Sequence, residues 1–458
     1  MAQKNIKIGL EIHGYLSTKE KLFCNCKAVR HAAKQDIKPN TFICPICTGQ
    51  PGCKPMLPNE EAIKKIIQIG LILGCKINEK FAFQRKHYSW PDLPKGYQDT
   101  ISGAYSIPIC ENGKFEDIKI NEAHLEEDPA SWNPETGCID YNRSGLPLVE
   151  IVTAPEFKSS SEVESWLNSL VLALSYIKAV DSNAGLKADV NISINKKEGQ
   201  ERVEVKNITS IQDIKKAIEY EIKRQSIEGT KRETRRYDSI KNITIKMREK
   251  EQAEDYRFIP DPDLPLIKLE KKRIRQIESQ MPETPQEKLN KLIKKHKLEK
   301  SDAEILYKNL ELVEFFEKVA EKIKPKEAIH WITIELKRVL NYSKKTLDEV
   351  EIEAEHFIEL LEAVIKKEIT ELKAKQILNS FIPKSYSIKS KLKKEGKIES
   401  KEIEEICKKI IKQNQKAVQD YLQGNQQSIN FLIGEVMKAS DRRADYKTAK
   451  ELLLKMLK

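Results

Sequence analysis

The sequence predicts an α+β protein in which a sheet-rich N-terminal part precedes a helical C-terminal part. Up to about residue 280, apolar and polar residues alternate, which is typical of strands with one buried face. Beyond that point apolar residues recur every three or four positions, as in "FIELLEAVI", which is typical of amphipathic helices. A chain of 458 residues is long for one core. We therefore expect an antiparallel-sheet domain over 1–283, an all-helical domain over 284–398 and a small helical tail over 399–458.

The composition indicates a soluble globular protein without a membrane partner. Hydrophobic residues make up 39% of the chain, and no apolar run is long enough to span a bilayer. The first residues contain no charged-then-apolar leader, from which we expect a cytoplasmic protein. The net charge of +11 favours a polyanionic partner, although a lysine-rich composition also accompanies genome bias or heat adaptation.

Four segments with the period of a strand predict a sheet face that carries charged side chains. The first, "IKIGLEIHG", places its aliphatic residues on one face and Glu11 beside His13 on the other. By the same alternation, "KADVNISI" contributes Asp189, "RVEVKN" contributes Lys206 and "ITIKMR" contributes Arg248. A solvated sheet face gives the same alternation. If the four strands share one sheet, its polar face collects carboxylates, a histidine and cations.

The segment "HLEED" adds Glu126 and Glu127 to these candidates. Carboxylates crowded next to an imidazole are costly unless a cation or solvent compensates them. Oxygen ligands with an imidazole suit Mg²⁺ or Mn²⁺, and neighbouring cations suit phosphate, so the set favours phosphoryl transfer. The segment "GLEIHGYL" is not a Walker loop, because Tyr15 stands where the lysine is required.

The cysteine spacing predicts a structural zinc site. The chain has nine cysteines, an odd number that argues against a disulfide framework. Cys24 and Cys26 form one close pair, and Cys44 and Cys47 form another, so four thiolates can close a tetrahedral Zn²⁺ site. The alternative is four reduced cysteines in a metal-free loop. No cysteine or serine nucleophile is placed beside a base, so we expect no covalent acyl intermediate.

The order of longer motifs resembles one known family. The segments "IGLEIHGYLSTKEKLFCNC", "CPICTGQPG", "RKHYSWPDLPKGYQ", "HLEEDPA", "DYNRSGLPLVEIVTAP", "DVNIS", "VEVKNITS", "ETRRYD" and "DYRFIPDPDLP" closely resemble the GatB/GatE family, the B subunits of GatCAB tRNA-dependent amidotransferases. The matches run in order over about residues 8–265, and the helical remainder fits more loosely. The longer GatE form carries an inserted domain for which this chain has no room.

The resemblance implies a fold, a reaction and partners. The implied fold is a cradle domain similar to glutamine synthetase and the guanidino kinases, then a helical domain and a YqeY-like tail that contacts tRNA. The implied ligase uses Mg²⁺ and ATP to phosphorylate the side-chain carboxylate of Asp or Glu misacylated onto tRNA. Ammonia released by the amidase partner, the A subunit, then displaces phosphate to give Asn-tRNA or Gln-tRNA. The implied complex is completed by a small C subunit.

The resemblance also implies roles for individual residues. Glu11, His13 and either Glu126 or Glu127 match the metal-binding positions of the family, and Asp189 is expected to join them.

Lys86, His87 and Tyr88 match the family segment near the ammonia entry, where polar side chains can relay a proton. One departure lies after the acidic run, where many relatives have Ala-Gly-Lys and this chain has "PAS", so a role for that lysine is lost or moved.

Cations are assigned to phosphate and tRNA. Arg143, Lys206 and Arg248 are the candidates for contacting ATP phosphates or the tRNA terminus. Arg442 and Arg443 are candidates for tRNA contact in the tail, where "RRADY" departs from the usual Gly-x-Ala-Asn-Pro turn. The alternative function is a non-enzymatic, zinc-containing RNA-binding or assembly protein, which explains the charge and the cysteines but not the acidic sheet face.

Overall fold

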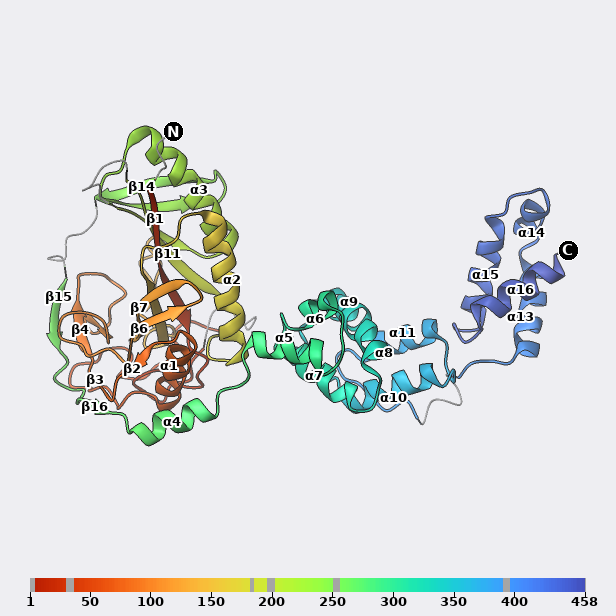
Figure 1. The fold of residues 1–458 in the computed structure, drawn as a ribbon, viewed down its shortest axis with the longest axis horizontal. Helices are drawn as coiled ribbons and strands as arrows, with labels where there is room; N and C mark the ends of the chain where they lie inside the picture. The colour runs from red at the N-terminus through yellow and green to blue at the C-terminus, as the bar shows by residue number, and fades with distance from the viewer. Residues whose placement is uncertain are drawn as a thin grey trace. The chain divides into compact units, whose positions relative to one another are not determined.

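The structure is a computed structural model that describes residues 5–29, 37–181, 185–195, 202–249, 256–389 and 396–457. The chain divides into two compact units, Met1–Thr284 and Pro285–Lys458, which are described separately (Figure 1). Among the described residues, the first unit holds the strands and helices α1 to α4, and the second is helical.

The first unit is built on a large sheet. Its strands are β1 Asn5–Tyr15, β2 Lys76–Ile77, β3 Lys80–Phe81, β4 Gln84–His87, β5 Tyr97–Thr100, β6 Cys110–Phe115, β7 Ile118–Glu127, β8 Ser131–Trp132, β9 Ile139–Asp140, β10 Pro147–Thr153, β11 Leu186–Asn195, β12 Val203–Ile208, β13 Glu233–Asp238, β14 Ile243–Glu249, β15 Arg257–Pro260 and β16 Ile267–Lys268. Its helices are α1 Glu60–Ile72, α2 Ser160–Tyr176, α3 Ile211–Glu228 and α4 Lys271–Ser279.

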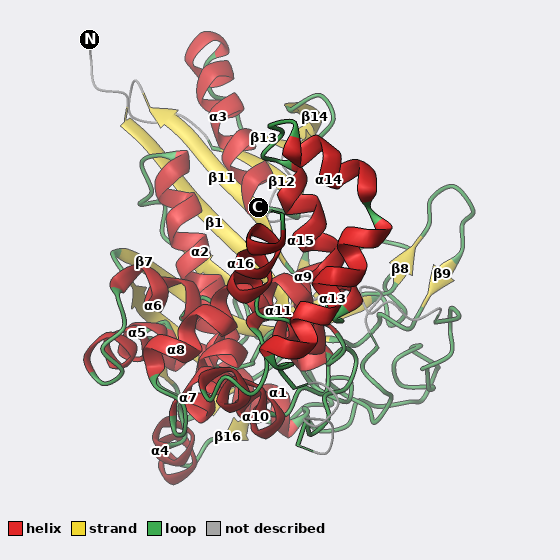
Figure 2. Cartoon of the chain, turned by 90° about the vertical axis from the view of Figure 1, so that its right-hand side faces the viewer, coloured by secondary structure: helices red, strands yellow, loops and turns green. Residues whose placement is uncertain are grey.

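The main sheet has 12 strands in the order β14-β13-β12-β11-β1-β10-β7-β5-β4-β15, with β6 and β2 joined to it through β7. The long central strands β1 and β11 run antiparallel side by side (Figure 2). The sheet is mixed rather than purely antiparallel, because β12 and β13 are parallel. A parallel pair needs a crossover connection, and α3 supplies it.

Helices α1, α2 and α3 lie along one side of the sheet (Figure 1). The aliphatic residues of the central strands pack under them: Ile8, Leu10 and Ile12 are at most 1% exposed, and Val190 and Ile192 are fully buried. The alternation predicted for β1, β11 and β12 is confirmed. Since successive side chains alternate, their polar residues lie on the opposite face.

The alternation predicted for β14 is wrong. Thr244 was expected on the polar face but is buried on the helix side, where it donates a hydrogen bond to Glu221 of α3. Met247, expected in the core, is 54% exposed. Thr244 lies opposite Tyr237 of β13, which packs against the core, and residues paired across strands share a face. Further along, Thr234 pairs with Arg248 and Arg235 pairs with Lys246, so Met247 is an extra residue of β14 and the strand does not keep one alternation along its length.

The second unit is helical, as the sequence predicts. Its elements are α5 Pro285–Lys294, α6 Lys300–Leu306, α7 Leu310–Ala320, α8 Pro325–His330, a π-helix Trp331–Leu336, α9 Lys337–Ser343, a 3₁₀-helix Leu347–Glu349, α10 Ala354–Ile365, α11 Glu371–Asn379, α13 Ser400–Gln413, α14 Gln415–Leu422, α15 Ser428–Ala439 and α16 Tyr446–Met456. The described residues form two hydrophobic cores, one around Phe316 and Phe357 and one around Cys407, Leu432 and Leu453. The division into three domains stays a prediction.

Within the described ranges, none of the helices combines the length and the apolar character that crossing a membrane requires.

Candidate active site

The strand register brings the candidate side chains together on the polar face of the sheet. Glu11 of β1 lies opposite Asp189 of β11, and His13 lies opposite Glu150 of β10. Strand β7 pairs with β10, and Glu126 of β7 lies opposite Leu148 of β10. Residues that pair directly across strands project to the same face, so the backbone register alone gathers these groups.

The first cluster consists of His13, Glu126 and Glu150, whose potential ligand atoms all lie within 4.8 Å of one another. The Glu150 Oε2 atom is 3.5 Å from His13 Nε2 and 3.1 Å from Nε2 of the buried His124. Burial lowers the pKa of His13, but the hydrogen bond and charge of Glu150 outweigh it and raise the pKa to about 9. Burial, reinforced by the charge of Glu150, raises the pKa of Glu126.

The second cluster consists of Glu11, Asp189 and Glu204, again with potential ligand atoms within 4.8 Å of one another. Burial raises the pKa of Glu11, and the charges of Glu150 and Glu204 add to the effect. The Lys206 ammonium lies 3.3 Å from Asp189 and 3.5 Å from Glu204, so this cluster contains its own cation. The Asn191 side chain donates a hydrogen bond to Glu11 at 2.8 Å.

Both clusters fit a divalent cation. Each combines carboxylate oxygens, and the first adds an imidazole nitrogen, which is the donor set of Mg²⁺ or Mn²⁺. The convergence of three acidic groups is repulsive unless a cation neutralises it. Among the described residues, no hydrogen-bond partner exists for the buried Asn191 Oδ1 or for His124 Nδ1, although Nδ1 lies 3.6 Å from Glu122 Oε1.

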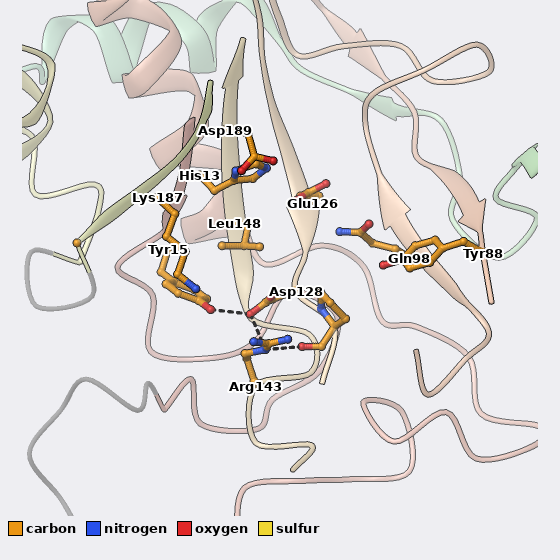
Figure 3. Close-up of a pocket in the computed structure, with 12 residues that line it drawn as sticks. His13, Tyr15, Tyr88, Gln98, Glu126, Asp128, Arg143, Leu148, Lys187 and Asp189 are labelled. Carbon is orange, nitrogen blue, oxygen red and sulfur yellow. Dashed lines mark hydrogen bonds and ion pairs between the residues drawn. The ribbon is translucent and has the colours of Figure 1, made fainter. Parts of the chain in front are cut away.

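A cavity of about 290 Å³ lies beside the first cluster (Figure 3). His13, Glu126 and Asp189 lie toward one end of the labelled group, and Arg143 lies at the other. The Tyr15 hydroxyl donates to Asp128 at 2.7 Å, and Arg143 is 3.2 Å from the same carboxylate. The cavity wall therefore contains His13 and Glu126 of the first cluster at one end and the Arg143 guanidinium at the other.

A second cavity, of about 180 Å³, lies on the other side of Glu11. Lys7 and Arg202 supply positive charge to its wall, and Asn191 and Ser193 supply polar groups. Carboxylates of the two clusters therefore line both cavities: Glu126 and Asp189 line the larger, and Glu11 lines the smaller.

Glu127 does not join the cluster with Glu126. Its carboxylate is 2.5 Å from the Lys95 ammonium and accepts a hydrogen bond from the Asp99 backbone N–H at 3.1 Å. Adjacent residues of a strand project to opposite faces, so of the two carboxylates left open by the sequence only Glu126 lies beside His13. Lys95, whose ammonium is paired with both Glu127 and Asp99, was not anticipated from the sequence.

The three residues expected on the ammonia path do not form one row. Tyr88 lines the first cavity, and the Lys86 ammonium lies 5.9 Å from the Tyr88 ring. The His87 ring instead packs against Tyr97, with ring centroids 5.3 Å apart. Burial raises the pKa of Tyr88, so its hydroxyl stays protonated near neutral pH.

The four predicted cysteine ligands, Cys24, Cys26, Cys44 and Cys47, come together with sulfur atoms within 4.8 Å of one another. A hydrogen bond from Cys24 lowers the pKa of Cys47 to about 5, and the charge of Lys21 contributes in the same direction. The Lys21 ammonium, which is almost fully buried, lies 3.4 Å from the Cys47 sulfur. The set fits a tetrahedral zinc site.

The remaining predicted cations are dispersed. Lys206 lies in the second cluster, as described above, whereas the Arg248 side chain lies outside the described residues. In the second unit, the Arg442 carbonyl accepts a hydrogen bond from Thr370, and Arg443 is 3.8 Å from Glu402.

Glu150 is the main site residue that the sequence reasoning missed. It sits in the apolar segment "PLVEIV", which reads as a buried strand. A single carboxylate in such a segment is itself a signal, because a buried strand does not retain an ionised group without partners. The partners are the two imidazoles of His13 and His124.

Comparison with known proteins gives matches over nearly the whole chain. A model described as the GatB/GatE catalytic domain matches residues 6–275, and one described as the GatB domain matches residues 314–457. The B subunit of an aspartyl/glutamyl-tRNA(Asn/Gln) amidotransferase from Methanococcus maripaludis strain C5 is 42% identical over 472 residues, covering 99% of this chain and 98% of the relative.

Two further proteins of the same name give similar values. The one from Methanocaldococcus jannaschii is 41% identical over 475 residues, covering 100% of this chain and 99% of the relative. The one from Methanothermobacter thermautotrophicus is 41% identical over 460 residues, covering 98% and 99%.

Proposed function

The chain belongs to the GatB/GatE family, and from this premise we propose that it is the kinase and transamidase subunit of a tRNA-dependent amidotransferase. Its substrates would be ATP and tRNA misacylated with Asp or Glu. Its partners, in the cytoplasm, would be an amidase that releases ammonia from glutamine, which is the A subunit, and a small C subunit. The observation that carries the proposal is the convergence of two acidic clusters on one sheet face beside a cavity.

The proposed chemistry has two steps. A side-chain carboxylate oxygen of the aminoacyl group attacks the γ-phosphorus of ATP, and ADP leaves. Ammonia then attacks the acyl carbon, and inorganic phosphate leaves with the electron pair of the broken C–O bond. Both steps require positioning and neutralisation of charge more than a protein nucleophile.

The residues of the polar face are suited to this task. His13, Glu126 and Glu150 would hold one divalent cation, and Glu11 and the other carboxylates of the second cluster would hold another. When bound, Mg²⁺ supplies charge neutralisation to the phosphates.

The two cavities suit the two substrates. The larger one would take the aminoacyl end of the tRNA, with positive charge from Arg143 and Lys187 on its wall. The smaller would take phosphates of the nucleotide, balanced by Lys7 and Arg202. Tyr88 lines the larger cavity, and its hydroxyl could donate or accept a hydrogen bond as ammonia arrives, whereas the Lys86 ammonium, 5.9 Å from the centre of the Tyr88 ring, could only donate.

The finer features of the fold are part of the same proposal. The sheet domain would be a cradle of the glutamine synthetase and guanidino kinase type, and residues 399–458 would be a YqeY-like tail in which Arg442 and Arg443 meet tRNA. The four cysteines would hold a structural Zn²⁺ that fixes the loop leading from β1 to α1.

The test is glutamine-dependent amide formation on Asp-tRNA and Glu-tRNA, in separate reactions, by the chain assembled with its two partner proteins, Mg²⁺ and ATP. Glu11→Gln is expected to lower the amidation activity at least about 100-fold, because it deletes a negative charge that would hold bound Mg²⁺. Glu278→Gln, on the exposed face of α4, is the matched control and is expected to behave as wild type. An assembled complex with wild-type tRNA binding but no ATP-dependent amide product would overturn the proposal and favour the RNA-binding alternative.

A further inference from the structure

We propose that an aromatic rim beside the larger cavity binds the unpaired 3′-terminal adenosine of the aminoacylated tRNA. The aromatic rim consists of Trp90, Asp92, Trp132 and Arg143. This inference rests on the proposed function, because it assumes that the acyl group in the cavity is carried by tRNA. It goes beyond it by assigning the nucleoside to side chains outside the carboxylate clusters.

The rim presents a large aromatic surface to solvent. The Trp90 and Trp132 rings meet edge to face, with centroids 5.6 Å apart and planes at 89°. Trp90 is nevertheless 51% exposed, so the pair holds the Trp90 ring in one orientation without covering it. A fixed, half-exposed indole is suited to stacking an unpaired base, because every base has a π-face.

The rim is connected directly to the cavity wall. The Ala130 backbone N–H donates to the Asp92 carbonyl at 2.9 Å, which ties the segment of Trp90 to the segment of Trp132. Arg143, which lines the cavity, donates to the carbonyls of Pro129 and Ala130 at 2.9 and 2.5 Å. Trp132 follows two residues later on β8, in the hairpin that extends from the sheet in Figure 2.

Asp92 provides an acceptor that none of the described residues uses. Its Oδ1 atom is buried and has no hydrogen-bond partner within the described part of the chain. Its Oδ2 atom lies 3.9 Å from the Arg143 guanidinium. A buried, unsatisfied carboxylate oxygen beside an aromatic ring and a guanidinium fits a ribose hydroxyl, which is a donor, next to a base and a phosphate.

The position of the rim agrees with the covalent structure of the substrate. In an aminoacyl-tRNA only a few bonds separate the side-chain carboxylate from the terminal ribose. If the carboxylate lies at the Glu126 end of the cavity, the ribose must lie near the opposite end, where Arg143 is found (Figure 3). The ring that can stack the attached adenine is therefore expected beside Arg143, and Trp90 and Trp132 are placed there.

The experiment measures whether Trp90 and the terminal nucleotide depend on each other. Two short RNA hairpins that copy a tRNA acceptor stem are prepared, one complete and one without its terminal adenosine. Binding to the assembled heterotrimer is measured for wild type and Trp90→Ala. Trp90→Phe keeps a ring and is the matched conservative variant, and Tyr105→Ala removes another exposed aromatic residue from a different loop.

The expected result is a pairwise dependence. Removing the adenosine should weaken binding to wild type about 5- to 20-fold, a size typical of one stacked base, and should change binding to Trp90→Ala by less than about twofold. Trp90→Phe should keep most of the difference, and Tyr105→Ala should keep all of it. In the amidation assay, Trp90→Ala should raise KM for aminoacyl-tRNA and leave KM for ATP unchanged.

Other outcomes overturn the inference. If the adenosine contributes equally to wild type and Trp90→Ala, the rim does not bind it. If Trp90→Ala prevents assembly with either partner protein, the surface belongs to a protein interface and the inference is also wrong. Failure of the proposed function looks different, because wild type would then form no amide at all while the binding experiment would still report on the rim.

Discussion

Divalent-metal affinity is expected to rise with pH through the neutral range, because a metal ion and a proton compete for the imidazole of His13. Glu150 holds the pKa of His13 at about 9 against the lowering effect of burial. A metal binds only the neutral imidazole. Well below pH 9, each unit of pH therefore changes the apparent affinity about tenfold, so raising the pH from about 6.5 to about 8.5 should strengthen binding about 100-fold.

The sign is opposite for the stability of the metal-free protein. A raised histidine pKa means that the folded state holds its proton more tightly than the unfolded state does. The stabilisation by His13 is therefore complete below its ordinary pKa of 6.5 and is lost as the pH rises through about 9. Metal affinity and metal-free stability should consequently change in opposite directions with pH.

The assay is titration with Mn²⁺, with free ion followed by electron paramagnetic resonance and heat followed in two buffers of different ionisation enthalpy. Wild type should release about one proton from His13 per metal bound near neutral pH. His13→Gln removes that proton, so the tenfold change in affinity per unit of pH should disappear. Binding to this variant should be weaker at every pH, because the imidazole ligand is lost. Equal affinities at the two pH values, with no dependence of the heat on the buffer, would refute the competition.

Three more predictions follow from the contacts. Glu126→Gln should reduce Mn²⁺ affinity at least about tenfold. Glu127→Gln should leave Mn²⁺ affinity within about threefold of wild type. Because it breaks the contact with Lys95, it should also lower the free energy of unfolding, measured in urea, by about 1–3 kcal/mol. Cys47→Ser should lower the zinc content, measured by elemental analysis, from about one per chain to nearly none. Phe357→Ala should lower the unfolding free energy of the second unit by about 3–5 kcal/mol without changing Mn²⁺ affinity, because its ring is fully buried in that unit.

The sequence predicts the local periodicity but not the partners across strands. Alternation places Glu11 and His13 on one face because that depends only on neighbouring residues. It does not identify Glu150, because the partner of His13 is decided by a register between strands more than a hundred residues apart. At β14 the local pattern fails, because pairing with β13 places Thr244 opposite Tyr237 on the core side and makes Met247 an extra residue of the strand.

The resemblance of motifs predicts which segments carry the site, which periodicity alone does not, but it does not distinguish between adjacent residues of one motif. It left Glu126 and Glu127 as alternatives, since both belong to one motif. The strand geometry separates them, because the Glu126 carboxylate lies beside His13 and the Glu127 carboxylate lies beside Lys95. The motif therefore predicts a candidate site, and the strand register shows which of its two carboxylates lies beside His13.

Each acidic cluster contains its own cation, so the binding of a divalent metal would be an exchange. In the first cluster the cation is the proton on His13, held by Glu150. In the second it is the Lys206 ammonium, whose pKa burial lowers but the charges of Asp189 and the neighbouring Glu204 raise further above its ordinary value. The first exchange would release a proton to solvent and would depend on pH near neutrality. The second would displace an ammonium that stays charged, so it would depend on Lys206, and that ammonium could then balance a phosphate.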